Sequence, residues 1–288
     1  MKFSNAFLAS EFRPAAAAGA AFHVIPAPME LSVSYGGGAR LGPQAILDAS
    51  QQLEICDGEG HASAANIHTQ KPVAPRSKTP EAWIGAVEER VARALACRAV
   101  PVVLGGEHTV TLGAARAFHA AGAKIGFIQF DAHADLRDAY EGTPLSHACV
   151  MRRVHELGFP CLQIATRAVS QEERDYRALN PKTITAYDAR EIADGQMSRR
   201  FIPRGFPKQV YVTFDVDGFD PTVMPATGTP VPGGLFWYDA LRMLRKIAAT
   251  RRIVGFDVVE LAPIKSLHHA DFAAALLTQT LMGLTAAI

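Results

Sequence analysis

The 288-residue sequence has few cysteines, no Cys-x-x-Cys pair and no apolar run long enough to span a membrane. Its four thiols are scattered through apolar surroundings, which indicates reduced, mostly packed side chains rather than a disulfide framework. These are Cys56, Cys97, Cys149 and Cys161. The N-terminus also lacks the charge order and apolar block of a signal peptide. We therefore expect a cytoplasmic protein with no membrane association.

An excess of charge of one sign is also missing from this chain. The formal net charge is +1 and no run of like charges occurs, which argues against a nucleic-acid partner. Hydrophobic residues make up 49% of the chain, which is enough for a sizeable core. Because no repeat, low-complexity tract or long linker divides the sequence, we predict a single domain over residues 1–288.

Short apolar runs alternate with longer amphipathic stretches, and this alternation predicts an α/β fold with a mainly parallel, doubly wound sheet. The predicted strands cover residues 100–104, 124–130, 209–214 and 252–259, with a weaker strand at 161–165. The predicted helices cover residues 79–97, 110–121, 145–157, 238–249 and 270–284. Residues 58–79 lack periodicity, and we expect them to form a surface excursion.

Histidine and aspartate residues follow three of the predicted strands directly. The three segments are Gly105-Gly106-Glu107-His108, Asp131-Ala132-His133-Ala134-Asp135 and Asp215-Val216-Asp217-Gly218. In a parallel α/β fold, ligand sites gather at the carboxyl ends of the strands. An extended backbone would also turn every second side chain of each segment to the same side. We therefore expect the three segments to build one site.

Together these segments supply two imidazoles and four carboxylates, from His108, Asp131, His133, Asp135, Asp215 and Asp217. That is too many ligands for one tetrahedral zinc ion, but it suits two ions that share carboxylates and activate one water between them. Oxygen-rich ligation with one histidine for each ion favours Mn²⁺, with cobalt, nickel and zinc left open. Each segment alone also fits turn or helix-cap chemistry, but four gathered carboxylates without cations would repel one another.

At these segments the sequence resembles the ureohydrolase family, which includes the arginases and agmatinases. The resemblance covers nearly the whole chain, since it continues in Arg40-Leu41-Gly42-Pro43, Thr227-Gly228-Thr229-Pro230 and Asp257-Val258-Val259-Glu260. It implies an arginase-like three-layer α/β/α sandwich and two manganese ions in each subunit. It further implies hydrolysis of a guanidino group to urea and an amine, and a homo-oligomer of three or six subunits.

The agmatinase branch of the family is the most similar in two segments. These are Ser34-Tyr35 with Arg40-Leu41-Gly42-Pro43, and Asp135-Leu136-Arg137-Asp138 with Ser146-His147-Ala148. The resemblance therefore implies that the reaction converts agmatine and water to putrescine and urea. Guanidinobutyrate or another ω-guanidino acid stays open, because Arg137 can receive a carboxylate. Formiminoglutamate and arginine are the next alternatives for the substrate.

The resemblance also assigns three catalytic side chains. It implies that Asp135 accepts a hydrogen bond from the attacking water, Glu260 binds the guanidinium, and His147 passes a proton to the departing amine. From the residues alone, Glu260 equally fits a buried acid paired with an arginine, and His147 fits an exposed residue at a helix start. Three other acids are candidates for orienting the metal ligands, namely Glu107, Asp257 and Asp220. Asp220 precedes Pro221 and therefore also fits a role in a turn.

Two other classes of function are open to this sequence. A zinc deacetylase of related fold would need one metal and fewer carboxylates, and a content near one ion per chain would favour it. A catalytically silent metal-binding or regulatory subunit would have a broken ligand set, whereas all six ligand positions are intact here. The sequence therefore favours an active enzyme.

Overall fold

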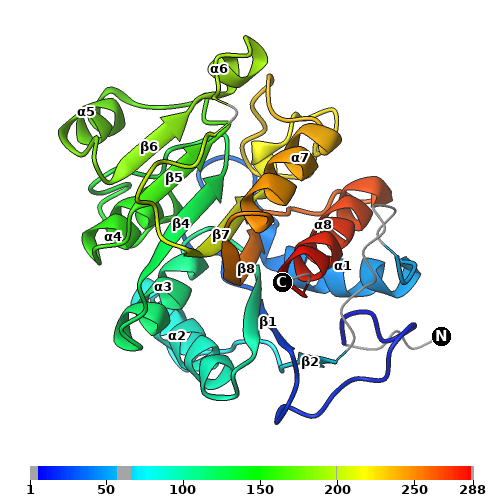
Figure 1. Ribbon diagram of the computed structural model, residues 1–288. Helices are drawn as coiled ribbons and strands as arrows, with labels where there is room; N and C mark the ends of the chain where they lie inside the picture. The colour runs from blue at the N-terminus through cyan, green and yellow to red at the C-terminus, as the bar shows by residue number, and fades with distance from the viewer. Residues whose placement is uncertain (1–5, 57–65, 199, 287–288) are drawn as a thin grey trace.

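The computed structural model describes residues 6–56, 66–198 and 200–286. These residues contain an eight-stranded sheet with the order β2-β1-β3-β8-β7-β4-β5-β6, in which every neighbouring pair is parallel. Parallel strands need long crossovers, and Figure 1 shows helices on both sides of the sheet. The strands are β1 (Phe22–Ala27), β2 (Ile67–Thr69), β3 (Val100–Gly105), β4 (Ile125–Phe130), β5 (Cys161–Ile164), β6 (Ile184–Tyr187), β7 (Gln209–Asp215) and β8 (Arg252–Val259).

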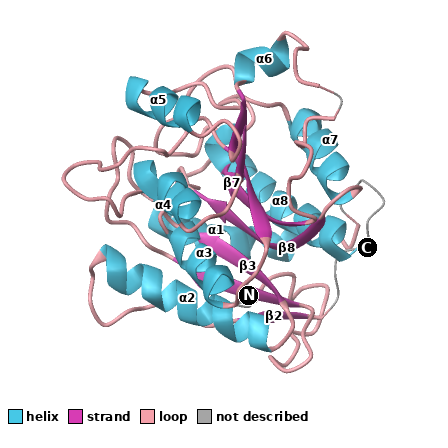
Figure 2. Ribbon diagram, turned by 60° about the vertical axis from the view of Figure 1, so that its left-hand side comes forward, coloured by secondary structure: helices cyan, strands magenta, loops and turns pink. Residues whose placement is uncertain are grey.

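The helices form two outer layers around this sheet (Figure 2). One apolar core is shared by the sheet with α1 (Gly42–Ala49), α7 (Trp237–Ala248) and α8 (His268–Ala286). A second core on the opposite face is shared with α2 (Pro80–Ala96), α3 (Val110–Ala120) and α4 (Val150–Glu156). The chain is therefore a three-layer α/β/α sandwich, which confirms the predicted fold class. Two short helices, α5 (Gln171–Leu179) and α6 (Ala189–Ala193), precede and follow the edge strand β6.

The sequence of β7 shows how a central strand serves both cores. Val210, Val212 and Phe214 lie in the core shared with α7 and α8, whereas Tyr211 lies in the opposite core. A near-continuous apolar run is what a strand covered on both faces requires. Thr213 breaks this run with a buried hydroxyl, and that hydroxyl is used at the site described below.

The structure corrects the predicted elements in several places. It adds β1, β2, β6, α1, α5 and α6. The prediction of a surface excursion over 58–79 is wrong for Ile67–Thr69, which pair with β1 as an edge strand, while residues 58–65 lie outside the described residues. The helix predicted over 145–157 is instead a 3-10 turn, His147–Cys149, followed by α4.

The cysteines form no disulfide, and two of them, Cys149 and Cys161, are buried. Cys56 and Cys97 are exposed, so only half of the thiols are packed as predicted. No helix in the described part of the chain has both the length and the apolar character needed to cross a membrane.

Four neighbouring strands in the middle of the sheet, β3, β8, β7 and β4, end at the same edge. Their registers pair Leu104 with Val258, Val258 with Phe214, and Phe214 with Phe130. The residues that follow these positions therefore emerge side by side. Such an edge is where open α/β sheets bind ligands.

Candidate metal centre

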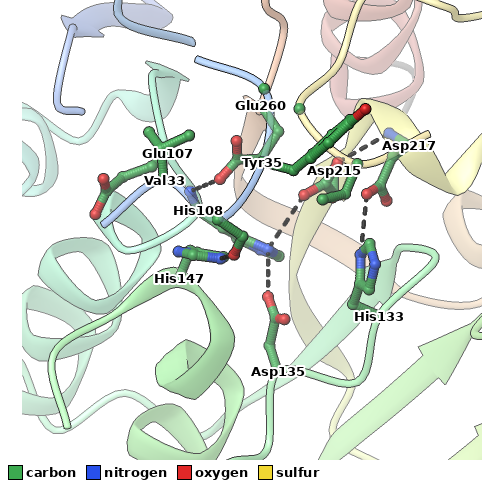
Figure 3. A pocket seen from close by; sticks show the side chains of 14 residues that line it. Val33, Tyr35, Glu107, His108, His133, Asp135, His147, Asp215, Asp217 and Glu260 are labelled. Carbon is green, nitrogen blue, oxygen red and sulfur yellow. Dashed lines mark hydrogen bonds and ion pairs between the residues drawn. The ribbon is translucent and has the colours of Figure 1, made fainter. Parts of the chain in front are cut away.

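The candidate site consists of side chains that emerge at this edge of the sheet (Figure 3). The loop after β3 starts at Gly106, where a Cβ would lie only 1.9 Å from the carbonyl oxygen of Met29. Only glycine permits this approach, which holds the β3 loop against the loop that follows β1. The strand-end side chains are His108 after β3, Asp131 after β4, Asp215 at the end of β7 and Glu260 after β8.

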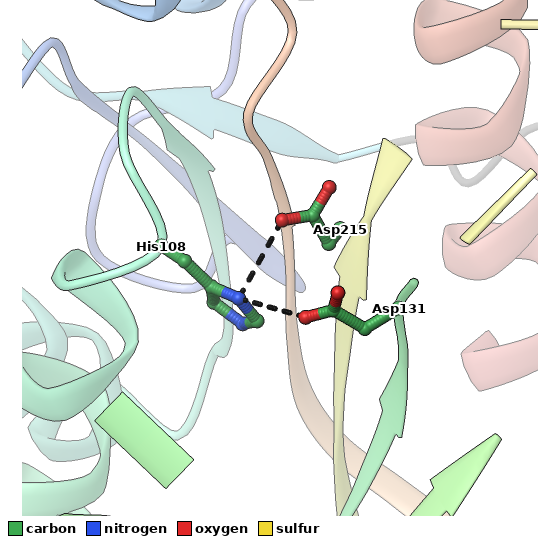
Figure 4. Close-up of side chains that lie close together, drawn as sticks. All are labelled: His108, Asp131 and Asp215. Atoms are coloured by element: carbon green, nitrogen blue, oxygen red, sulfur yellow. Dashed lines mark ion pairs between the residues drawn. The ribbon is translucent and has the colours of Figure 1, made fainter. Parts of the chain in front are cut away.

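The first group of potential metal ligands surrounds Nδ1 of His108 (Figure 4). This nitrogen lies 3.2 Å from Oδ2 of Asp131 and 3.6 Å from Oδ2 of Asp215. Oδ2 of Asp135 is nearer still, at 2.9 Å. All four side chains are buried, so little solvent screens their charges.

The second group contains His133, Asp217 and again Asp131. Nδ1 of His133 lies 3.0 Å from Oδ2 of Asp217 and 3.5 Å from Oδ1 of Asp131. Asp131 thus turns one carboxylate oxygen to each imidazole, which is the arrangement expected of a carboxylate shared by two ions. The structure therefore brings together all six side chains that the sequence singled out.

The backbone brings these side chains together by turns, so the expected extended geometry is wrong. Asp135 has a φ of 54°, in the left-handed region that non-glycine residues rarely adopt. Asp217 lies in a 3-10 turn, Val216–Gly218, and its backbone N–H donates to the Asp215 carboxylate at 2.8 Å. The turn carries Asp215 and Asp217 to different imidazoles, whereas alternation along an extended strand would keep them on one side.

The hydrogen bonds of His108 show which of its ring nitrogens faces the carboxylates. Thr213 donates its only hydroxyl proton to Asp257 at 2.7 Å, so its oxygen accepts from Nε2–H of His108 at 2.8 Å. The neutral ring then has a lone pair on Nδ1, and this buried atom has no hydrogen-bond partner. A lone pair directed at carboxylate oxygens is unfavourable unless a proton or a metal cation lies between them. Burial lowers the pKa of His108, but Asp131 and Asp135 outweigh burial and raise that pKa well above its usual value, so a proton takes this place when no metal is bound. These donor atoms therefore fit a divalent cation.

The aspartates of the site also fit a cation-binding role. Burial, followed by repulsion from Asp131, raises the pKa of Asp135 to about 7. Burial and neighbouring carboxylates likewise raise the pKa of Asp215 and of Asp217. Cations bound among these carboxylates would attract them and outweigh their mutual repulsion, which would keep all of the carboxylates ionised.

Glu260 lines the same pocket as His108, Asp215 and the other potential ligands drawn in Figure 3. Its Oε1 accepts a hydrogen bond from the backbone N–H of His108 at 2.6 Å, which joins the ends of β8 and β3. Burial raises the pKa of Glu260 to about 8, and its φ of 63° is again left-handed. No arginine forms an ion pair with Glu260 among the described residues, which argues against the reading of a structural acid paired with an arginine.

His147 is partly buried and lines the same pocket, so the reading of an exposed helix-start residue is wrong. Its Nδ1 lies 3.1 Å from the hydroxyl of Ser32 and its Nε2 lies 2.8 Å from the hydroxyl of Ser34. Burial lowers the pKa of His147, so the neutral imidazole predominates near pH 7.

The site opens outward through two adjoining pockets. The inner pocket has a cavity volume of about 30 Å³ and is lined by Glu260 and by all the potential ligands except Asp131. The outer pocket has a cavity volume of about 420 Å³ and is lined in addition by Arg137, Tyr140 and Glu173. Both pockets share Ser34, His133, Asp135, His147 and Thr229. An elongated molecule can therefore place one end at the ligand groups and the other in the outer pocket.

Comparison with known proteins agrees with this arrangement. Residues 20–283 match the family model described as the Arginase family. The chain belongs to the arginase family. It is 41% identical over 275 residues to an N(1)-aminopropylagmatine ureohydrolase of Synechocystis, covering 92% of this chain and 89% of the relative. It is 32% identical over 266 residues to an agmatinase of Pyrococcus horikoshii, covering 91% of each chain.

Solved structures of the arginase family have the same fold. The crystal structure of agmatine ureohydrolase of Thermoplasma volcanium superposes with a TM-score of 0.80 at 27% identity, covering 99% of this chain and 96% of that chain. Arginase from Medicago truncatula superposes with the same TM-score at 23% identity, covering 92% of this chain and 87% of that chain. The arginase-like sandwich predicted from the resemblance is thereby confirmed.

Several side chains that support the site in this member of the arginase family were not singled out from the sequence. Thr213 orients His108, and Gln129 donates to Oδ2 of Asp131 at 2.7 Å. Both stand two residues before an aspartate on a buried strand, and a polar residue in such a strand is the signal that would have found them. Arg167 donates to the carbonyl oxygens of Asp217, Phe219 and Val231, which fixes the loop after β7.

The three acids considered for orienting the ligands have distinct positions. Asp257 accepts from Thr213 beneath His108, as expected of an orienting group. Glu107 binds the loop after β1 and the hydroxyl of Ser32. Asp220 accepts from Thr222, Gly233 and Gly234, so it has the turn role that was the alternative for it.

Proposed function

We propose that this chain hydrolyses the guanidino group of agmatine, or of an agmatine lengthened at its amine end, to urea and an amine. One observation carries the proposal. The carboxylate of Glu260 lies in the same pocket as the two groups of potential metal ligands, with no cationic side chain paired to it among the described residues. A planar guanidinium would pair with such a carboxylate through two parallel hydrogen bonds.

We propose that His108, Asp131 and Asp215 hold one divalent cation, with Asp135 beside it. Asp131 would be shared with the second cation, which His133 and Asp217 complete. Manganese is the metal we propose, because oxygen-rich sites with one imidazole for each ion suit it. When bound, such a pair of cations supplies Lewis-acid activation of water and neutralises developing negative charge.

Three side chains would then complete the chemistry. Glu260 binds the guanidinium and orients its carbon, which removes much of the entropic cost of the encounter. Asp135 accepts a hydrogen bond from the attacking water and directs it, and its left-handed backbone points the carboxylate into the pocket. His147 delivers a proton toward the departing amine, because an alkylamine leaves poorly without one.

A substrate longer than agmatine is the second candidate. The relative that is 41% identical is named for N(1)-aminopropylagmatine, and the outer pocket offers room for a longer chain. That pocket is lined by Glu173, a buried carboxylate that accepts from Leu136 and Ser170 but pairs with no cation among the described residues. A terminal ammonium group of the substrate would neutralise it.

The proposed function is tested by measuring urea release after loading the protein with manganese. The panel consists of agmatine, N(1)-aminopropylagmatine, arginine and guanidinobutyrate. We expect urea from one or both agmatine-type compounds, and preference for the longer one would identify the outer pocket as a binding site for its tail. Preference for guanidinobutyrate would instead assign Arg137 to a carboxylate. Protein that holds two ions but releases urea from none of the four would contradict the proposal.

A further inference from the structure

Four side chains form a continuous chain of hydrogen bonds from a buried carboxylate to the substrate pocket. Glu107 accepts from the hydroxyl of Ser32 at 2.9 Å. The Ser32 oxygen lies 3.1 Å from Nδ1 of His147, and Nε2 of His147 lies 2.8 Å from the hydroxyl of Ser34. Ser34 is the last member of the chain, and it lines both the inner and the outer pocket.

The direction of each hydrogen bond in this chain follows from counting protons. Glu107 accepts two backbone amides and the hydroxyls of Ser32 and Thr109, so it is an acceptor throughout. The only hydroxyl proton of Ser32 is therefore committed to Glu107, and its oxygen must accept from Nδ1–H of His147. The hydroxyl of Ser146 lies farther from Nδ1, at 3.4 Å. Neutral His147 thus has its lone pair on Nε2, and Ser34 donates to it.

The position of Ser34 is fixed by the backbone beside it. Gly36 N–H donates to the carbonyl oxygen of Gly228 at 3.1 Å, and a Cβ on Gly36 would lie 2.9 Å from that oxygen. The loop after β1 is therefore held against the loop after β7 at this point. Ser34 lies between this contact and the bond from Ser32 to Glu107. The loop holds the hydroxyl between His147 and the space that the substrate would occupy.

We infer that Ser34 is a catalytic residue that relays a proton from Nε2 of His147 to the nitrogen of the departing amine. This inference rests on the proposed function. In the step, the bond between the guanidino carbon and the substituted nitrogen breaks, and its electron pair stays on that nitrogen. His147 enters this step as an imidazolium, having gained at Nε2 a proton that the attacking water gives up. The nitrogen of the leaving group takes the proton of the Ser34 hydroxyl, and the Ser34 oxygen recovers one from Nε2–H of His147, which leaves the imidazole neutral. The water consumed supplies the oxygen of urea and, overall, both protons that convert the leaving R–NH group to R–NH₃⁺.

Direct transfer from His147 is less compatible with this geometry. Both ring nitrogens already have serine partners, and Nε2, the nitrogen on the pocket side, faces the Ser34 oxygen. A hydroxyl both accepts and donates, so it can pass on a proton without moving the imidazole. Ser32 and Glu107 on the other side would hold the ring in the required tautomer and favour its protonated form through charge.

The relay is tested with Ser34→Ala on two substrates of similar shape whose leaving groups differ strongly in basicity. The first is the better of the two agmatine-type compounds. The second is its oxyguanidine isostere, in which oxygen replaces the methylene group next to the guanidino nitrogen. The isostere releases an alkoxyamine, a far weaker base than an alkylamine, so its departure depends less on a proton donor. Each variant is compared with the wild type on the same substrate, so intrinsic differences between the substrates cancel.

We expect kcat of Ser34→Ala to fall roughly 10- to 100-fold on the alkylguanidine and no more than about threefold on the isostere, with KM changed little on both. Ser34→Thr keeps a hydroxyl and should restore most of kcat. Should Ser34→Ala fail to accumulate as folded protein, Ser34→Gly removes the same hydroxyl and gives the same comparison.

Equal losses on both substrates, or a change in KM alone, would overturn the relay and leave Ser34 a structural or binding role. Full activity of Ser34→Ala would overturn it as well. If the wild type releases no urea from any guanidino compound, the proposed function fails and the relay fails with it. If the wild type is active and Ser34→Ala is equally active, the relay is excluded while the proposed function stands.

Discussion

His108 donates Nε2–H to Thr213 at 2.8 Å, and this bond leaves Nδ1 as the nitrogen that faces the site carboxylates. Thr213→Val removes the acceptor while keeping a similar shape, so the imidazole loses the bond that fixes its tautomer. We expect the affinity for one of the two ions to fall roughly 10- to 100-fold, as measured by competition with a metal chelator. Thr213→Ser keeps the hydroxyl and should retain the affinity. Equal affinities in the wild type and the valine variant would contradict this role.

The shared position of Asp131 predicts a difference between two aspartate variants. Asp215→Asn alters one ligand group, whereas Asp131→Asn alters both, because Asp131 belongs to each. Elemental analysis should find about two ions per wild-type chain, about one in Asp215→Asn and fewer than one in Asp131→Asn. Asp138→Asn, at an exposed carboxylate nearby, serves as the control. One ion per wild-type chain would instead favour the single-zinc class.

Glu260 belongs to neither group of ligands, so its removal should separate substrate binding from metal binding. Glu260→Gln keeps an oxygen that can accept from the backbone of His108 but loses the charge that pairs with a guanidinium. We expect kcat/KM for the guanidino substrate to fall about 100-fold, equivalent to about 2.7 kcal/mol, with an unchanged metal content. Steady-state kinetics with metal analysis on the same sample measures both. If Glu260→Gln lost its metal as well as its activity, the prediction that Glu260 binds substrate and not metal would be wrong.

Asp220 predicts a pH-dependent contribution to stability away from the ligands. Partial burial alone would raise its pKa, but hydrogen bonds from Thr222, Gly233 and Gly234 outweigh that effect and lower the pKa. Stability from a depressed pKa is present above the unfolded value, near pH 4, and is lost as the pH falls through the folded value. Asp220→Asn should therefore lower the free energy of unfolding by about 1–2 kcal/mol at neutral pH.

The same deficit should shrink below about pH 4, where the wild-type carboxylate becomes protonated. Calorimetric unfolding of both proteins at neutral and acid pH measures the difference. Asp194→Asn is the matched control, because Asp194 is exposed and its nearest cation, on Arg190, lies 3.7 Å away. A deficit that is independent of pH would show that shape rather than charge matters at position 220.

The sequence predicted the central strands because their apolar runs are long and bounded by motif residues, as in β7 and β8. It did not predict β2 or β6, since edge strands of three and four residues are too short to show a period. Helix α5 was also missed, because its segment Gln171–Leu179 is mostly charged and buries only Glu173. Tertiary context, rather than a local apolar pattern, stabilises these elements.

The six potential ligands could be selected from the sequence because strand ends converge in any parallel sheet. The directions in which these side chains point could not be predicted, because they depend on the left-handed backbone at Asp135 and the 3-10 turn at Asp217. The serines around His147 illustrate the same limit. Ser32 and His147 are far apart in the chain, and only the folded loop after β1 brings them within 3.1 Å.

The positive φ angles of Asp135 and Glu260 have a consequence for how this protein can be changed. A side chain other than glycine costs roughly 1–2 kcal/mol in such a conformation, so the two carboxylates weaken the fold that carries them. Glycine at either position would relieve this backbone strain, while removing the charge. Selection for heat resistance without selection for activity would therefore favour replacement of these two carboxylates, and the variants obtained would be inactive.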